Sequence, residues 1–311
     1  MRKFKFNYLA LSLLVSLACS CSSGGDEPDV PTPTPTPDKP VVEKIPINLS
    51  LNVNKSTSST RATDTGYDNG DKIGLYVVNY SGSTAGTLQS SSNHVNNMSF
   101  TYDGTWTPAS PIYWKDNETH ADFYCYYPYA SVSDIAALSF SVKADQSTTE
   151  AYKASEFLYG KKSNVAPTES AVSITTNHLF SCAIIKVAAG NGFTTESLAA
   201  AEVSVKLNNV QTGAAINLKD GSVSATGEAQ SITPLLENGS YKALIVPQSV
   251  SADNFITVTV DGRDFNLKKE FTFVGGKRHT FTVTVSKTSN GVNVSIGAWE
   301  DDGTDNGGTA E

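Results

Sequence analysis

Apolar and polar residues alternate along this chain with a period of two, and this pattern limits its fold more than any other feature. Successive side chains of a β-strand point to opposite faces, so an alternating run has one apolar face to bury. The clearest run covers residues 45–53 and predicts a half-buried strand. Its apolar positions are Ile45, Ile47, Leu49, Leu51 and Val53.

Further strand-like runs follow almost to the end of the chain, separated by turn formers such as Asn69-Gly70, Asp220-Gly221 and Asn290-Gly291. Only Thr195–Ala201 has a helical pattern. About fourteen runs are too many for one seven-stranded sandwich, so the sequence predicts an all-β protein with two tandem β-sandwich domains. The turn-rich stretch Ser163–Ser170, with Pro167, suggests a boundary. The predicted domains are 45–170 and 171–311, the second ending in a polar tail.

The N-terminus has the pattern of an export signal. Basic residues come first, and a short apolar run, Leu9–Ala18, ends beside Cys19 and Cys21. The run is too short to span a bilayer comfortably. A cysteine at this boundary, followed by polar residues, resembles a bacterial lipoprotein signal. We therefore expect residues 1–20 to be removed and Cys21 to be lipidated, with Cys19 as the alternative. An ordinary secretory signal is the simpler interpretation.

Residues 21–44 form a spacer rather than part of a core. Proline alternates with threonine over Pro31–Pro37. Each proline fixes its own φ, and such a stretch favours the extended polyproline II conformation. This Pro/Thr-rich tether would hold the folded part of the protein away from a membrane.

Composition and motifs argue against several function classes. The chain has 23 Lys and Arg against 31 Asp and Glu, a net charge of −8, so we expect no nucleic-acid partner. The four His and four Cys show no zinc-ligand spacing, and we expect no metal or cofactor. No nucleophile elbow or phosphate-binding loop occurs, so we expect no enzyme. Cys125 and Cys182 could pair, but their apolar surroundings favour buried free thiols.

Several segments, taken in order, resemble the fimbrillin family. They are Arg61–Tyr67, Gly70–Tyr76, Pro111–Trp114, Asp122–Tyr129, His178–Phe180, Ile245–Gln248, Gly276-Lys277, Phe281–Val285 and Trp299. This resemblance implies two transthyretin-like sandwiches and a structural, non-catalytic role in a type V pilus. It also implies a surface-exposed precursor held in the cell outer membrane by its lipid.

The same resemblance implies how such a subunit matures. An arginine-specific protease cuts fimbrillins in a loop after the first strand, and Arg61-Ala62 is the matching position. The cut would displace the strand 45–53. A strand from another subunit would fill the vacated groove. The donor candidate is the alternating C-terminal run Val292, Val294, Ile296 and Ala298. Alternatively, both segments stay in their own sandwiches.

The expected function is therefore that of a pilus subunit assembled by donor-strand exchange, with a role in cell adhesion and other pilus subunits as partners. The alternative is a monomeric surface lipoprotein that acts as an adhesin or a glycan-binding module. A surface receptor on host or bacterial cells is expected in either case, and its identity is unknown. Native size after Arg-specific proteolysis distinguishes a polymer from a monomer.

Overall fold

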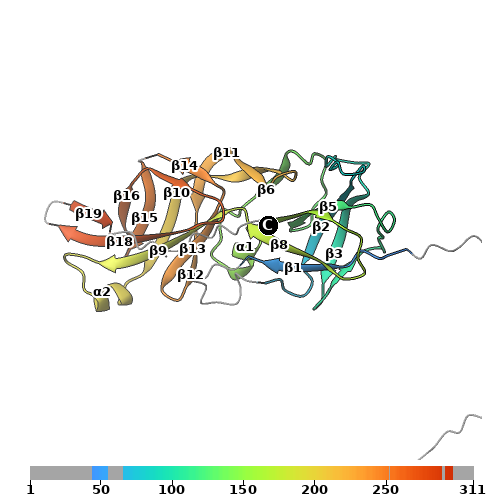
Figure 1. Ribbon diagram of the computed structural model, residues 1–311. Coiled ribbons are helices and arrows are strands. Elements are labelled where there is room, and N and C mark those ends of the chain that lie inside the picture. Colours follow the sequence, from blue (N-terminus) through green and yellow to red (C-terminus); the bar gives the residue numbers. More distant parts are fainter. Residues whose placement is uncertain (1–43, 55–65, 252, 289–290, 297–311) are drawn as a thin grey trace, which may run out of the picture. The chain divides into compact units, whose positions relative to one another are not determined.

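The computed structural model describes residues 44–54, 66–251, 253–288 and 291–296 (Figure 1). These residues contain nineteen strands and two short helices. The strands form sandwich-like sheets, which confirms the all-β prediction. The count of two sandwiches and their transthyretin-like character stay predictions. Two separate unfolding transitions would support the count.

The first half of the chain builds a seven-stranded sheet with the order β1-β8-β7-β5-β2-β3-β4. The first strand, β1, pairs in parallel with β8, whereas the remaining neighbours are antiparallel. The bounds are β1 Leu49–Val53, β2 Lys72–Asn79, β3 Val95–Tyr102, β4 Trp106–Pro108, β5 Ala121–Tyr127, β7 Leu158–Val165 and β8 Val172–His178.

The second half builds two five-stranded sheets and one short pair. One sheet has the order β11-β10-β15-β16, with β6 also paired to β10. The other has the order β12-β13-β9-β18-β19, and β14 pairs with β17. The bounds are β6 Leu138–Ser141, β9 Ser181–Ala189, β10 Val203–Asn217, β11 Ser222–Ile232, β12 Leu235–Glu237, β13 Ser240–Ile245, β14 Gln248–Val250, β15 Asn254–Val260, β16 Arg263–Lys268, β17 Phe271–Phe273, β18 Arg278–Thr288 and β19 Gly291–Ile296. The helices are α1 Thr149–Lys153 and α2 Thr195–Ala200.

The predicted boundary at Ser163–Ser170 is wrong in position. Strands β7 and β8 lie on either side of this stretch and pair in register Leu158↔His178 and Tyr159↔Asn177. The stretch therefore includes the end of β7 and a connection between two neighbours in one sheet. Pro167 lies in this connection, and a proline in a polar stretch does not distinguish a connection within one sheet from a domain linker.

Two apolar clusters cover the two faces of the seven-stranded sheet. Strand β5 contributes to both, because its side chains alternate. Phe123 and Cys125 belong to the cluster that also contains Ile47 and Leu49, which precede or begin β1. Tyr124 and Tyr126 belong to the larger cluster that includes the C-terminal sheets. Phe123, Tyr124 and Tyr126 are therefore core residues.

A buried glutamine closes a gap in the C-terminal sheet. Gln146 has no solvent exposure. Its Oε1 accepts from the Leu244 amide at 2.8 Å, and its Nε2 donates to the Leu244 and Lys143 carbonyls at 2.8 and 3.0 Å. Strand β12 pairs only with residues 240–242 of β13. The side-chain amide of Gln146 therefore forms hydrogen bonds with the backbone of Leu244, which β12 does not reach.

Gln146→Ala should destabilise the protein by about 2–4 kcal/mol, because it leaves buried backbone groups unpaired. Thermal or denaturant unfolding measures this. The control is Gln89→Ala, since Gln89 is exposed. Equal stability of the two variants would contradict the role given to the Gln146 amide.

Candidate functional site

The first strand lies at the edge of its sheet, bonded to the body on only one side of its backbone. Within the register Leu49↔Val172 to Val53↔Thr176, β1 runs parallel to β8. The Val172 amide donates to the Asn48 carbonyl and the Asn54 amide to the Thr176 carbonyl, both at 2.8 Å. Figure 1 shows β1 beside β8. An edge strand can leave without breaking pairs between the other strands.

The segment before β1 is extended but is not part of the regular strand. The predicted strand covers 45–53, whereas β1 begins at Leu49. Proline lacks a backbone N–H, and Pro46 forms only an isolated bridge with Tyr113. The Trp114 amide donates to the Ile45 carbonyl, and the Ile47 amide donates to the Ile112 carbonyl, each at 2.9 Å. These bonds continue the attachment toward the N-terminus.

The alternating apolar residues of this segment fill a groove in the apolar core beside β8. Ile47, Leu49 and Val53 are buried, and Ile45 and Leu51 are partly buried. All of them except Val53 pack in the cluster whose other buried members include Trp114, Phe123, Val172 and Ile174. Trp114 is 4% exposed, so its side chain belongs to the packed core. Three buried side chains at roughly 1.5–3 kcal/mol each contribute about 5–9 kcal/mol before entropy costs.

Tyr67 closes the end of this groove that adjoins the last residue of β1. Its ring makes edge contacts with Trp106 and Tyr127 at centroid distances of 4.8 and 5.8 Å. Its hydroxyl lies 2.8 Å from Thr176 Oγ1. Burial raises the pKa of the Tyr67 hydroxyl, so the group stays protonated and can donate. A cavity of about 70 Å³ lies here, and both Val53 and Tyr67 line it.

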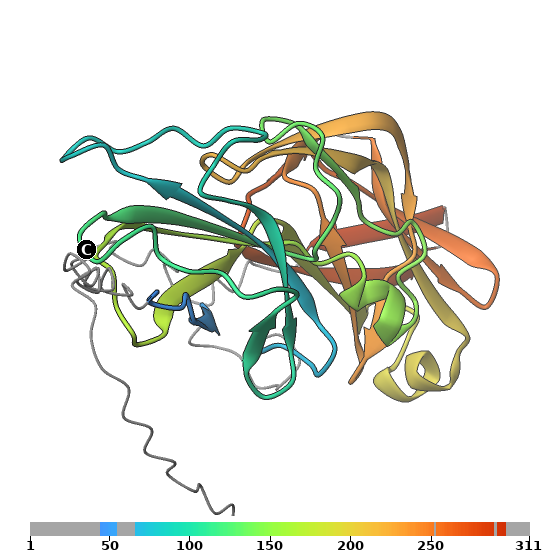
Figure 2. The same cartoon turned by 90° about the vertical axis from the view of Figure 1, so that its right-hand side faces the viewer.

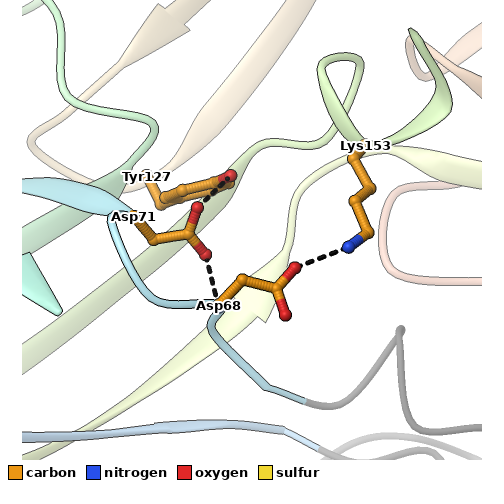
Figure 3. Close-up of polar contacts among 4 residues, drawn as sticks. All are labelled: Asp68, Asp71, Tyr127 and Lys153. Atoms are coloured by element: carbon orange, nitrogen blue, oxygen red, sulfur yellow. Dashed lines mark hydrogen bonds and ion pairs between the residues drawn. The ribbon is translucent and has the colours of Figure 1, made fainter. Parts of the chain in front are cut away.

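A polar network holds the turn that follows Tyr67 (Figure 3). Asp71 accepts from the Asp68 amide at 2.8 Å and from the Tyr127 hydroxyl at 3.1 Å. Lys153 donates to Asp68 at 2.5 Å. Asp68 is 71% exposed, so that ion pair contributes little to stability. The chain is therefore fixed to the body at Asn54 and again from Tyr67 onward.

The predicted cleavage residues, Arg61 and Ala62, lie outside the described residues, as do Cys19, Cys21 and Ala298. The other donor-strand positions, Val292, Val294 and Ile296, lie on β19. This strand pairs antiparallel with β18 at the edge of a five-stranded sheet (Figure 2, red). The structure thus places the candidate displaced strand and the candidate donor strand in different sheets and does not bring them together.

Other residues that the sequence singled out have structural roles. Cys125 and Cys182 are both buried, and burial raises the pKa of the Cys125 thiol. The Nδ1 atom of His178 lies 3.0 Å from Oε2 of Glu156. Within the described ranges, no group of three His, Cys, Asp or Glu could hold a metal. No helix in this part of the chain is long and apolar enough to cross a membrane.

Comparison with known proteins relates this arrangement to pilus subunits. A family model described as fimbrillin-like matches residues 60–299. A Bacteroides uniformis protein named "Putative fimbrium subunit Fim1C" is 26% identical over 263 residues, covering 78% of this chain and 81% of that protein.

Solved structures share the fold at low identity. A crystal structure titled "putative cell adhesion protein", from Bacteroides uniformis, has a TM-score of 0.60 and 22% identity, and the match covers 83% of this chain and 98% of that one. One of the same description from Bacteroides ovatus has a TM-score of 0.65 and 18% identity, with the same coverage.

Proposed function

This chain belongs to the fimbrillin-like family, and from that premise we propose that it is a structural, non-catalytic subunit of a cell-surface pilus, assembled by donor-strand exchange. The observation that supports exchange most directly is the placement of β1. It is an edge strand that inserts alternate apolar side chains into a groove, and the segment with Arg61 follows it directly.

Cleavage between Arg61 and Ala62 by an arginine-specific protease would separate β1 from the rest of the sheet. Asn54 and Tyr67 are each hydrogen-bonded to Thr176, the first by its backbone and the second by its side chain. A cut after Arg61 lies between Asn54 and Tyr67, so the contact between Tyr67 and Thr176 would be kept. The body would keep its turn at Asp68–Asp71 and lose only the strand. The family match also begins beside this position, at residue 60.

Loss of β1 would expose the edge of β8 and the apolar groove under it. The amide of Val172 and the carbonyl of Thr176 would then lack their strand partners. Unpaired edge groups next to apolar surface favour the addition of another strand. Residues 292–298 of a neighbouring subunit have the required alternation, and β19 is itself an edge strand that can leave its sheet.

Native size on cells, before and after treatment with an Arg-specific protease, tests this proposal. We expect a ladder of polymers after the cut, with Ala62 as the new N-terminus. A single monomeric species after complete cutting would reject strand exchange and favour the monomeric adhesin.

We also propose that the precursor is a lipoprotein of the outer membrane, anchored through Cys21. Cys21→Ala should release the protein from the membrane fraction, because one lost acyl anchor removes the hydrophobic attachment. Cell fractionation with and without detergent measures this. If the Cys21→Ala protein stays in the membrane fraction and the Cys19→Ala protein is released, Cys19 is the lipidated residue.

A further inference from the structure

One continuous stretch of chain joins the sheet that holds β1 to the sheet that holds β19. Only Leu179 and Phe180 separate the end of β8 from the start of β9. Among the described residues, the register of β8 with β7 covers only Asn177 and His178. Residues 172–176 of β8 pair with β1 instead. A pull on a strand in the position of β1 would therefore pass along β8 into the start of β9.

Strands β9 and β18 form a long parallel pair. Their register holds eight residue pairs without a shift, whereas β1 and β8 share five. Beyond the last pair, the Lys287 amide donates to the Asn191 carbonyl at 2.6 Å. The inward side chains of β18, Phe281, Val283 and Val285, are buried in the core. Figure 1 shows the two strands side by side, extending away from β8.

The two strands of this pair connect to the rest of the chain at opposite ends. Strand β9 continues from β8 at its N-terminal end, whereas β18 leads to β19 from its C-terminal end. Because the strands are parallel, tension between β8 and the end of β18 pulls them lengthwise past each other. Lengthwise sliding strains all the hydrogen bonds of a ladder at once, whereas opening from one end breaks them one after another.

We propose that the β9–β18 pair carries the tension in an assembled pilus, and that this tension passes through β8, β9 and β18 of each subunit. The inference rests on the proposed strand exchange, in which residues that follow β18 insert beside β8 of the next subunit. A filament fixed at both ends transmits tension through every subunit. An inserted strand that takes the direction of β1 runs parallel to β8, so the junction between subunits is also pulled lengthwise.

Single-molecule pulling on the uncut full chain tests the geometry. Handles on unnatural side chains at Ser173 in β8 and Lys287 in β18 pull the pair lengthwise, and both positions are exposed. Handles at Asn191 and Lys287, whose backbones are bonded to each other, open the same pair from its end. At equal loading rate, unfolding in the lengthwise geometry should need at least about threefold more force. Equal forces would overturn the proposal.

A matched pair of core variants separates resistance to force from ordinary stability. Val283 on β18 and Val258 on β15 are both fully buried in the same apolar cluster. Val283→Ala and Val258→Ala should lower the free energy of unfolding similarly in denaturant, because they remove the same atoms. Under constant lengthwise force, Val283→Ala should raise the unfolding rate at least about fivefold and Val258→Ala less than about twofold. A rate increase that follows the lost stability equally in both variants would contradict the role of β18.

The pulling experiments do not require polymers, so the two proposals can fail separately. High lengthwise resistance without polymers after the Arg-specific cut would reject strand exchange, and the role of β9 and β18 in a pilus would fail with it. Polymers that form normally from a subunit with equal resistance in both geometries would support strand exchange and overturn the path of tension through β9 and β18.

Discussion

Arg61→Ala should leave the protein folded, uncut and unassembled. While β1 stays covalently attached, its effective concentration at the groove is on the order of millimolar, and a donor strand from another subunit cannot compete. Cutting removes this advantage, because β1 then remains with the tether and its lipid. We expect the Arg61→Ala protein to run as a monomer under native conditions and to stay in the membrane fraction. Native electrophoresis and N-terminal sequencing measure both properties.

The matched control is Lys55→Ala, which removes the other basic residue between β1 and Ala62. It should be cut and assembled like the unmodified protein, because an arginine-specific protease does not use Lys55. Normal polymers from Arg61→Ala would show that the cut is not required. Strand exchange after cleavage would then fail for this protein, and the monomeric adhesin would be the better interpretation.

Strands with one buried face could be predicted from the sequence, and those without one could not. The alternation in residues 45–53 predicted β1, because apolar residues on one side must be covered. Strand β11 was missed because it is exposed along most of its length and carries few apolar residues. In the sequence of β10, apolar residues recur only over 203–207 and 214–218, a pattern that predicts two short strands. Strand β10 is one strand of 15 residues, and irregularities in its pairing occur over the polar middle.

The site could be predicted only as far as it follows local pattern. Tyr67 belongs to a segment that resembles the fimbrillin family, but its contact with Thr176 joins residues 109 positions apart. No spacing rule connects them. Thr176 was not singled out, because a threonine in an alternating strand predicts only β structure. Its hydrogen bond with Tyr67 depends on how the two segments pack, which is a property of the tertiary structure.

Ile296→Asp should permit cleavage at Arg61 but reduce assembly by at least about a hundredfold. In the inserted strand this side chain would face the apolar groove, where a carboxylate has no partner, and burying it costs several kcal/mol.

Ser295→Asp is the matched control. Adjacent residues of a strand point to opposite faces, so the same charge at residue 295 would face outward and allow assembly. Residue 296 also belongs to β19 in the subunit itself, so thermal unfolding of both monomers must be compared. If the two variants are equally stable and equally cut, reduced assembly by Ile296→Asp alone assigns the donor role to the inward face of residues 292–298. Equal assembly of the two proteins would exclude this segment as the donor.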